Sequence, residues 1–183
     1  MKLEEKATSS REIYKGRVVH LFEDEVVLAN GRTSSREYVK HIGAVCVIAL
    51  TDENEIILER QYRYPFHRVL IEIPAGKLDS PDEDPREAAL RELREETGAV
   101  AGSIEYLGDF FGSPAIMGET VRVFLARDLS FGEQELDRDE MLEVFTMPIA
   151  DAVREVMAGN IPDGKTQAGI LRAYMILKGE GRI

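Results

Sequence analysis

Three glutamates near the middle of the chain have the spacing of one helical face. Glu92, Glu95 and Glu96 lie within five consecutive residues, and at about 100° per residue they project within one arc. Neighbouring carboxylates repel each other, and oxygen-only ligands suit hard cations such as Mg²⁺ or Mn²⁺. The pattern therefore fits either a solvated acidic face, partly neutralised by Arg91 and Arg94, or a metal site.

The helix that would position these glutamates has boundary signals at both ends. Asp84 can cap it, Pro85 suits its first position, and Glu87 is placed to complete a capping box. Gly98 supplies a stop signal at the other end. The sequence therefore predicts a helix over Pro85–Thr97.

Short apolar and β-branched runs predict strands on both sides of this helix. The predicted strands are Glu12–Tyr14, Arg17–Leu21, Glu25–Leu28, Glu37–His41, Gly43–Leu50, Glu55–Arg60, Val69–Ile73, Ser103–Phe111 and Thr120–Ala126, and further helices are predicted over Ile149–Ala158 and Thr166–Leu177. Asn30-Gly31 has the sequence of a type I′ hairpin turn. This order predicts an α+β fold with a mixed sheet and an N-terminal antiparallel β-meander.

Composition excludes several classes of protein. The chain has 183 residues, 44% of them hydrophobic and 31% charged, with a net charge of −11. Such acidity disfavours binding to a nucleic-acid backbone. Cys46 is the one cysteine, which excludes an internal disulfide and a cysteine-based zinc site. No apolar run reaches the ~18 residues of a membrane span, and no signal-peptide pattern is present. We therefore expect a cytoplasmic protein without membrane or nucleic-acid partners.

The segment from Gly76 through Glu83 to Arg91-Glu92-Leu93-Arg94-Glu95-Glu96-Thr97-Gly98-Ala99 resembles the Nudix box. The interval between Gly76 and Glu83 is one residue longer than the family's usual form, and we predict a loop insertion before the helix. The resemblance implies a Nudix-type mixed β-sheet sandwiched between helices. It also implies a catalytic domain over 43–183, preceded by an N-terminal strand unit over 1–42.

The same resemblance implies roles for the residues of the box. Those that would hold a divalent cation, Mg²⁺ or alternatively Mn²⁺, are Glu92, Glu95, Glu96 and the backbone carbonyl of Ala75. Supporting roles fall to Gly76, to Glu83 and to Arg91, which would orient a glutamate by ion pairing. A divalent cation would neutralise a diphosphate and polarise a water for attack at phosphorus.

Segments outside the box are similar to the ADP-ribose pyrophosphatase branch of the family. They are Gln61-Tyr62-Arg63-Tyr64, Glu72-Ile73-Pro74-Ala75-Gly76 and Ser113-Pro114, although this chain has Ala115 where the branch usually has glycine. The resemblance implies hydrolysis of ADP-ribose to AMP and ribose 5-phosphate. It also implies a homodimer in which two subunits exchange their N-terminal strands.

The branch resemblance extends to individual residues. Arg63 would contact the phosphates or the terminal ribose, and Glu72 would hydrogen-bond a ribose or an adenine edge. Arg36 would reach the adenine of the partner subunit's ligand. Glu119, on the loop after Pro114, would act as general base or as an added metal ligand. If Glu119 is not the base, Glu95 or a metal-bound hydroxide remains. Simple surface charge is the alternative for the two arginines and for Glu119.

Other functions stay open at this point. The substrate could be another nucleoside diphosphate derivative, such as NADH or a sugar nucleotide, or a nucleoside triphosphate. A non-catalytic ligand-sensing Nudix protein would be expected to have a degraded box or an added DNA-binding segment, and the sequence shows neither.

Three further signals are weighed and set aside. The run from Gly159 to Thr166 matches the Walker A pattern literally, but it follows an amphipathic helix and not a buried strand. It therefore favours a boundary between two helices. His20, His41 and His67 lie too far apart in sequence for a local metal pair. Cys46 sits in an apolar run and is interpreted as a small buried hydrophobe.

Overall fold

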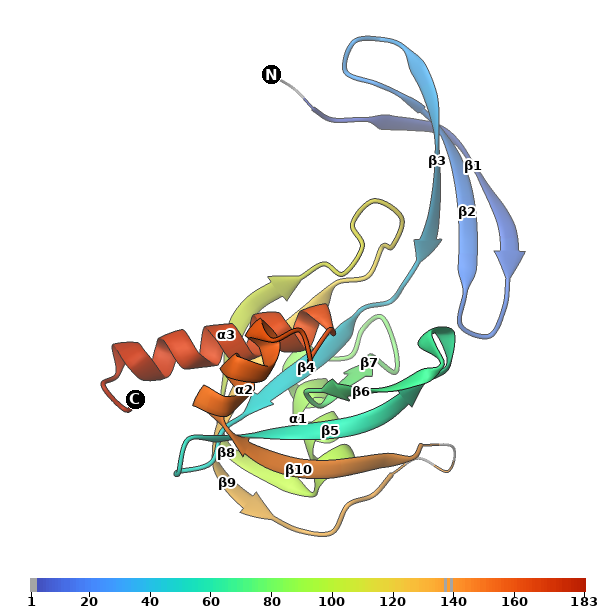
Figure 1. The fold of residues 1–183 in the computed structure, drawn as a ribbon. Coiled ribbons are helices and arrows are strands. Elements are labelled where there is room, and N and C mark those ends of the chain that lie inside the picture. The colour runs from blue at the N-terminus through green and yellow to red at the C-terminus, as the bar shows by residue number, and fades with distance from the viewer. Residues whose placement is uncertain (1–2, 137, 139) are drawn as a thin grey trace. The chain divides into compact units, whose positions relative to one another are not determined.

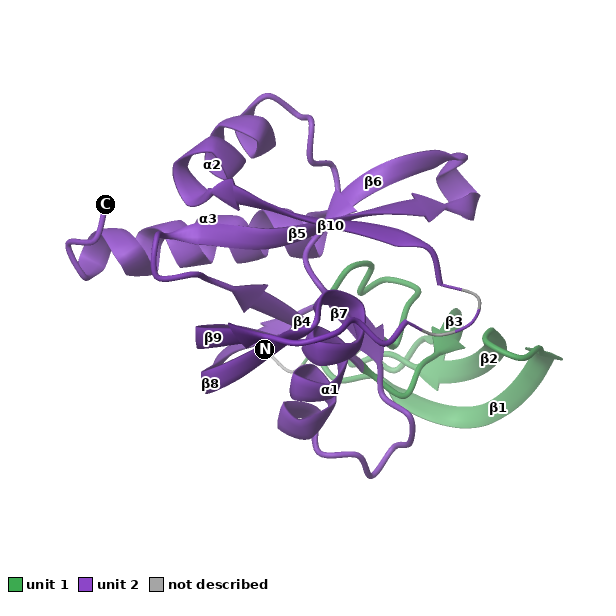
Figure 2. Ribbon diagram, turned by 90° about the horizontal axis from the view of Figure 1, so that it is seen from below, with its two compact units in different colours: residues 1–43, 111–120 green, residues 44–110, 121–183 purple. Residues whose placement is uncertain are grey.

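The computed structural model describes residues 3–136, 138 and 140–183, and these form two compact units (Figure 2). Unit 1 contains the chain up to Gly43 and the segment Phe111–Thr120. Unit 2 contains Ala44–Phe110 and Val121–Ile183. The boundary predicted from the sequence lies after residue 42. The structure differs in that Phe111–Thr120 also belongs to the N-terminal unit.

Unit 1 is built on a three-stranded antiparallel sheet in the order β1-β2-β3 (Figure 1). The strands are β1 (Lys6–Lys15), β2 (His20–Val27) and β3 (Thr33–Lys40). The expected N-terminal meander is confirmed. The prediction of separate strands over Arg17–Leu21 and Glu25–Leu28 is wrong, because the polar residues between them continue the same ladder. The positions of apolar residues underestimate the length of a strand in an exposed sheet, because polar residues also pair there.

The turn between β2 and β3 also differs from the prediction. The amide of Gly31 donates to the carbonyl of Leu28 at 2.8 Å, and the amide of Leu28 donates to the carbonyl of Arg32 at 2.8 Å. Gly31 has a φ of 83°, whereas Asn30 is not in the left-handed region. This is a three-residue loop that ends in a left-handed glycine, and it needs only one positive φ. The type I′ prediction is therefore wrong.

Unit 1 buries little of its own surface. Val26 is the one hydrophobic side chain that is buried among its described residues. All ten residues of β1 are exposed. The later segment is attached to β3 by backbone hydrogen bonds, from the amide of Val39 to the carbonyl of Ile116 and from the amide of Gly118 to the carbonyl of Val39, both 2.8 Å.

Unit 2 contains two sheets. The mixed sheet has the order β7-β4-β9-β8, with β4 parallel to β9 and the other pairs antiparallel. The second sheet is antiparallel, in the order β10-β5-β6. Their strands are β4 (Ala44–Ala49), β5 (Glu55–Arg63), β6 (Arg68–Glu72), β7 (Ala75–Lys77), β8 (Ala99–Phe110), β9 (Val121–Phe131) and β10 (Leu142–Pro148). Sequence analysis does not predict β7, which is too short for a pattern, or β10.

Helices cover both faces of the mixed sheet (Figure 2). The helix on one face is α1 (Pro85–Thr97) and the helix on the other is α3 (Gly164–Gly179), whereas α2 (Ile149–Met157) packs against α3 and the second sheet. Alternate residues of β4 face opposite ways, so Val45 and Val47 pack against α1, whereas Cys46 and Ile48 pack in the core that contains α2 and α3. The expected α+β fold with a mixed sheet between helices is confirmed.

The ends of α1 follow the sequence signals. The Asp84 carboxylate accepts a hydrogen bond from the amide of Arg86 at 2.7 Å, and Gly98 ends the helix with a φ of 70°. The predicted capping box is wrong, because Glu87 accepts from the side chain of Arg86. No helix in the described part of the chain combines the length and apolar character that a membrane span requires.

Candidate functional site

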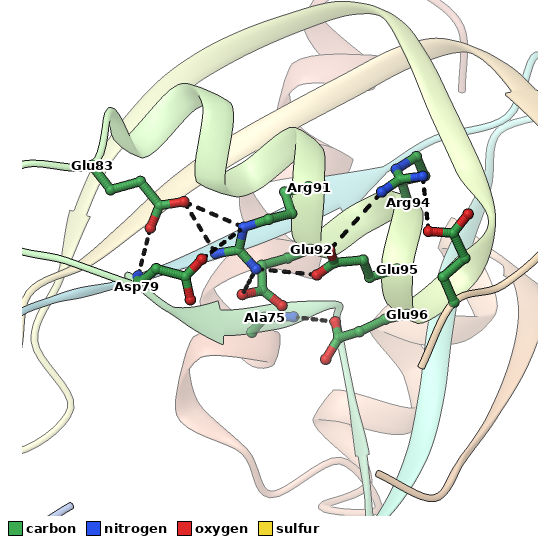
Figure 3. Close-up of polar contacts among 9 residues, drawn as sticks. Ala75, Asp79, Glu83, Arg91, Glu92, Arg94, Glu95 and Glu96 are labelled. Atoms are coloured by element: carbon green, nitrogen blue, oxygen red, sulfur yellow. Dashed lines mark hydrogen bonds and ion pairs between the residues drawn. The ribbon is translucent and has the colours of Figure 1, made fainter. Parts of the chain in front are cut away.

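The three glutamates of α1 lie together on the side of the helix that faces β7 (Figure 3). Glu92 is 9% exposed and Glu96 is 2% exposed, while the Glu95 side chain is 30% exposed. Buried carboxylates are rare unless they are paired or bind a metal ion. A solvated acidic face is therefore wrong for Glu92 and Glu96.

Arg91 organises the carboxylates around it (Figure 3). Its Nη1 donates to Glu92 Oε1 at 2.8 Å and to Glu95 Oε2 at 3.1 Å. Its Nη2 donates to Glu83 Oε1 at 3.2 Å, and its Nε lies 3.6 Å from Asp79 Oδ2. Partial burial opposes the positive charge, but Glu92 and the other carboxylates outweigh it and raise the pKa of Arg91. One guanidinium thus faces four carboxylates.

The loop before α1 keeps Glu83 within reach of Arg91. The amide of Glu83 donates to the carbonyl of Ser80 at 3.2 Å, and Glu83 Oε2 accepts from the amide of Asp79 at 2.6 Å. The extra residue of the box therefore lies in a turn that ends before the helix begins. That this residue is an insertion relative to the family stays a prediction.

Gly76 allows the carboxylate of Glu92 to lie directly against β7. A Cβ atom at residue 76 would lie 2.0 Å from Glu92 Cδ, far inside van der Waals contact. One residue earlier, the amide of Ala75 donates to Glu96 Oε2 at 2.9 Å. Two carboxylates of α1 are therefore held against the backbone of this strand.

Ionisation of the buried carboxylates Glu92 and Glu96 is energetically unfavourable. Burial, Glu59 and Glu92 raise the pKa of Glu96 to about 9, against the opposing hydrogen bond from Ala75. Burial also raises the pKa of Glu92, although Arg91 opposes the shift. Burial is the largest cause of both shifts, and neighbouring carboxylates add to it.

The donor set fits a hard divalent cation. Glu92, Glu95, Glu96 and the carbonyl of Ala75 supply oxygen atoms only, which is the chemistry that Mg²⁺ and Mn²⁺ prefer. Within the described residues, no three acidic, histidine or cysteine side chains already converge as a metal-binding cluster. Arg91 and the amide of Ala75 hold these carboxylates in their present positions.

A second charged cluster lies at the ends of β5 and β6. Arg63 Nε donates to Glu72 Oε1 at 2.6 Å, and its Nη2 donates to Glu72 Oε2 at 2.7 Å. Lys165 donates to the same Glu72 Oε2 and, at 3.1 Å, to Asp163 Oδ2. Burial alone would raise the pKa of Glu72, but Arg63 and Lys165 lower it below its ordinary value. The structure thus brings together the predicted pair Arg63 and Glu72.

Glu59 and Lys165 are residues that sequence analysis missed. Glu59 is 1% exposed, pairs in register with Glu72, and neither of its carboxylate oxygens has a hydrogen-bond partner among the described residues. Burial and Glu72 raise the pKa of Glu59 to about 8. A charged residue directly after the apolar run Ile56–Leu58 was the available signal. Lys165 belongs to the Walker-like run that was set aside.

The remaining predicted residues lie in unit 1. Arg36 Nη2 pairs with Glu5 Oε1 at 2.6 Å, and Glu119 Oε1 lies 3.6 Å from His41 Nε2. Pro114 follows Ser113, whose carbonyl accepts from the amide of Met117 at 2.8 Å. The roles of Arg36, Pro114 and Glu119 toward a ligand stay predictions.

The signals that were set aside behave largely as expected. Gly159 has a φ of 80° and lies between the end of α2 and the start of α3, so the Walker-like run is a helix boundary. Cys46 is fully buried, and burial raises the pKa of its thiol to about 12, which leaves it unreactive at neutral pH.

Comparisons with known proteins extend over both units. The NUDIX domain profile matches residues 40–167, and the profile of the nucleoside diphosphate sugar hydrolase N-terminal domain matches residues 5–39. An ADP-ribose pyrophosphatase of Bacillus subtilis is 45% identical over 178 residues, which are 96% of this chain and 95% of that protein. A methanol dehydrogenase activator of Bacillus methanolicus is 44% identical over 165 residues, 89% of each protein.

The crystal structure of an ADP compounds hydrolase has a TM-score of 0.86 to this chain and covers 100% of both chains at 22% identity. This likeness shows that the two proteins share a fold. The NUDIX profile spans more than half of the chain, and the Bacillus subtilis relative is matched over nearly its whole length. With the box residues on α1 and β7, these matches show that the chain belongs to the Nudix family.

Proposed function

We propose that this protein hydrolyses the diphosphate bond of ADP-ribose, giving AMP and ribose 5-phosphate, with Mg²⁺ as its cation and Mn²⁺ as a substitute. The observation that carries the proposal is the buried carboxylate face of α1, held against β7 where Gly76 leaves room for Glu92. The name of the Bacillus subtilis relative supports ADP-ribose as the substrate.

The cation would be held by Glu92, Glu95, Glu96 and the carbonyl of Ala75. A bound divalent cation offsets the charge of the diphosphate and polarises a phosphoryl oxygen and a water. Arg91 holds Glu92 and Glu95 in one arrangement, which lowers the entropy cost of ordering these ligands. An acidic protein with a net charge of −11 can then accept an anionic substrate at this point.

Arg63 and Glu72 are proposed to bind the substrate beside the metal site. Nε and Nη2 of Arg63 donate to Glu72, and its Nη1 makes no hydrogen bond to the residues that the structure describes. A guanidinium with a spare N–H can donate to a phosphate or hydroxyl oxygen. Glu72 can accept a hydrogen bond from a ribose hydroxyl.

Glu119 is proposed as the general base, on the strength of the family resemblance. Carboxylates bound to a cation are poor proton acceptors, so a base outside the box is favoured. General-base loss typically lowers a rate by ~10²–10⁴-fold. Glu119→Gln should therefore lower kcat by this factor, with a smaller change in KM for ADP-ribose and little change in Mg²⁺ affinity. An unchanged kcat would move the base to Glu95 or to a metal-bound hydroxide.

We also propose a homodimer in which Arg36 contributes to the partner subunit's ligand site. The support is the small core of unit 1, where β1 is exposed throughout and Val26 alone is a buried hydrophobe among the described residues. A three-stranded sheet of this kind needs a further surface for stability. Light scattering should give the mass of a dimer, and deletion of residues 1–42 should give a monomeric or insoluble chain. A monomeric and fully active full-length protein would contradict the proposal.

A substrate panel tests the proposed reaction. Relatives at 45% and 44% identity have different names, so identity alone does not select the substrate. ADP-ribose, NADH, a sugar nucleotide and a nucleoside triphosphate are each incubated with the protein and Mg²⁺, and products are separated by chromatography. AMP and ribose 5-phosphate should form fastest from ADP-ribose. Tight binding without any product would indicate a ligand-sensing protein.

A further inference from the structure

Lys165 is a largely buried lysine in the first turn of α3. Its side chain is 13% exposed, and its ammonium group contacts the carboxylates of Glu72 and Asp163. Burial opposes the charge, but Asp163 and Glu72 outweigh it and raise the pKa of Lys165. A buried ammonium group is stable in a fold only with such partners. Contacts with Glu72 and Asp163 therefore fix the position of the ammonium group, whereas the side chain of an exposed lysine is free to move.

Lys165 adds a third hydrogen bond to the Glu72 carboxylate, beside the two from Arg63. An ionised carboxylate has about four acceptor positions. Arg63 occupies one on Oε1 and one on Oε2, and Lys165 occupies the second on Oε2. One acceptor position therefore remains on Oε1, beside the guanidinium whose Nη1 has no partner among the described residues. The pair thus holds one donor, on the partly exposed Arg63, and one acceptor, on the buried Glu72, in a fixed orientation.

The start of α3 is tied to the end of β6 at a second, adjacent point. Thr166 Oγ1 accepts a hydrogen bond from the amide of Ile73 at 3.0 Å and donates to Asp163 Oδ2 at 2.6 Å. Asp163 also caps α3 by accepting from the amide of Thr166 at 2.9 Å. Two consecutive residues of the helix therefore contact two consecutive residues of the chain that leads into β7.

We propose that Lys165 is a positioning residue that holds Glu72, so that the Arg63–Glu72 pair presents a preorganised donor and acceptor to a nucleoside diphosphate. Lys165 acts through Glu72 and does not contact the ligand. The inference rests on the proposed function, because it takes the Arg63–Glu72 pair as part of the substrate site. The lysine and threonine of the Walker-like run thus bind a strand end, where a P-loop would bind phosphate.

The test compares Lys165→Met, Lys165→Arg and the control Lys178→Met, a lysine in the last turn of the same helix that is exposed. Steady-state kinetics with ADP-ribose at saturating Mg²⁺ are combined with calorimetric binding of the non-hydrolysable α,β-methylene analogue. The size of the expected effect is that of losing one hydrogen bond between charged groups. Lys165→Met should raise KM and the Kd of the analogue by roughly 10–100-fold, with kcat changed by less than about threefold.

Two comparisons separate positioning from general support of the fold. Lys165→Arg keeps a cation beside Glu72 and should restore KM to within about fivefold of the wild-type value. The Mg²⁺ concentration for half-maximal activity should stay unchanged in every variant. Lys178→Met should match the wild type throughout. Thermal unfolding of each variant shows whether the protein is folded at the assay temperature, and Lys165→Gln replaces Lys165→Met if the apolar side chain prevents folding.

The outcomes are distinct. A folded Lys165→Met or Lys165→Gln variant with wild-type KM and analogue Kd overturns the inference. A fall in kcat at constant KM also overturns it, since that result would place Lys165 in the reaction itself. The wild-type measurement tests the proposed function separately. If the wild type cleaves another nucleotide of the panel, ADP-ribose is the wrong substrate, and the same variants are compared on that nucleotide.

Discussion

Arg91 and Arg63 each hold glutamates within unit 2, but the net charges of the two clusters differ. Around Arg91, one guanidinium faces four carboxylates. Around Glu72, two cations share one carboxylate, and Asp163 balances the second cation. The first cluster has a surplus of negative charge that a bound cation can offset. The second is internally neutral, so it is suited to hold fixed hydrogen-bonding groups for a polar ligand.

The pKa shifts of the glutamates follow this difference. Glu72 and Glu96 are both nearly inaccessible to solvent, at 1% and 2% exposure. Burial acts in the same direction on both, yet the pKa of Glu72 is lowered by Arg63 and Lys165 whereas the pKa of Glu96 is raised further by Glu59 and Glu92. Burial raises both pKa values, and the difference in sign between the two groups comes from the neighbouring charges.

The largest effect is expected from Glu96→Gln. Glutamine retains an acceptor for the amide of Ala75, so the fold should persist, but it removes charge that would hold the cation. Loss of several kcal/mol of cation stabilisation corresponds to about 10³-fold in kcat. Wild-type protein should also melt at a higher temperature when Mg²⁺ is added, and the variant should not. Near-wild-type turnover at saturating Mg²⁺ would refute the metal assignment.

A smaller effect is expected from Arg63→Lys. Lysine has no fork that can bond both oxygens of Glu72 and still donate to a ligand. KM for ADP-ribose should rise by roughly tenfold or more, with the Mg²⁺ requirement unchanged. Arg68→Lys is the matched control, because Arg68 pairs with Arg63 in register but has an exposed side chain. Equal effects of the two substitutions would count against a specific role for Arg63.

The smallest effect is expected on stability, from Glu59→Gln in the absence of divalent cations. The pKa of Glu59 is raised from 4.5 to about 8 in the folded protein. The folded state therefore binds more protons than the unfolded state between these pH values, and wild-type stability should fall as the pH rises through this window. Glutamine does not ionise, so the Glu59→Gln variant should keep its stability over this pH range.

At pH 8.5 to 9, Glu59→Gln should melt several degrees above the wild type, because the wild type must ionise a buried carboxyl there. The difference should vanish near pH 4.5. Glu143→Gln, on the neighbouring β10 with its side chain 70% exposed, is the control and should show little change at either pH. A pH-independent difference for Glu59→Gln would mean that its charge is not the cause.

Local signals predicted the parts of the site that lie on one element. The spacing of Glu92, Glu95 and Glu96, with Asp84 and Gly98 at the helix ends, gave the bounds of α1 as the structure has them. The mixed sheet between helices followed from the order of the elements and from the family resemblance. The prediction failed where one local pattern is compatible with two structures. Asn30-Gly31 fits a type I′ turn, but it also fits the observed loop, in which only Gly31 is left-handed.

The sequence by itself determined that α1 presents a carboxylate face and that Gly76 precedes it, one residue further away than in the usual Nudix box. Only the tertiary structure decided which carboxylates are buried and which cations reach them. Lys165 lies 93 residues from Glu72, and Glu59 meets Glu72 only through the register of β5 and β6. Charge interactions in a folded protein depend on distance and burial in space, and neither quantity is encoded in the spacing of residues along one strand or helix.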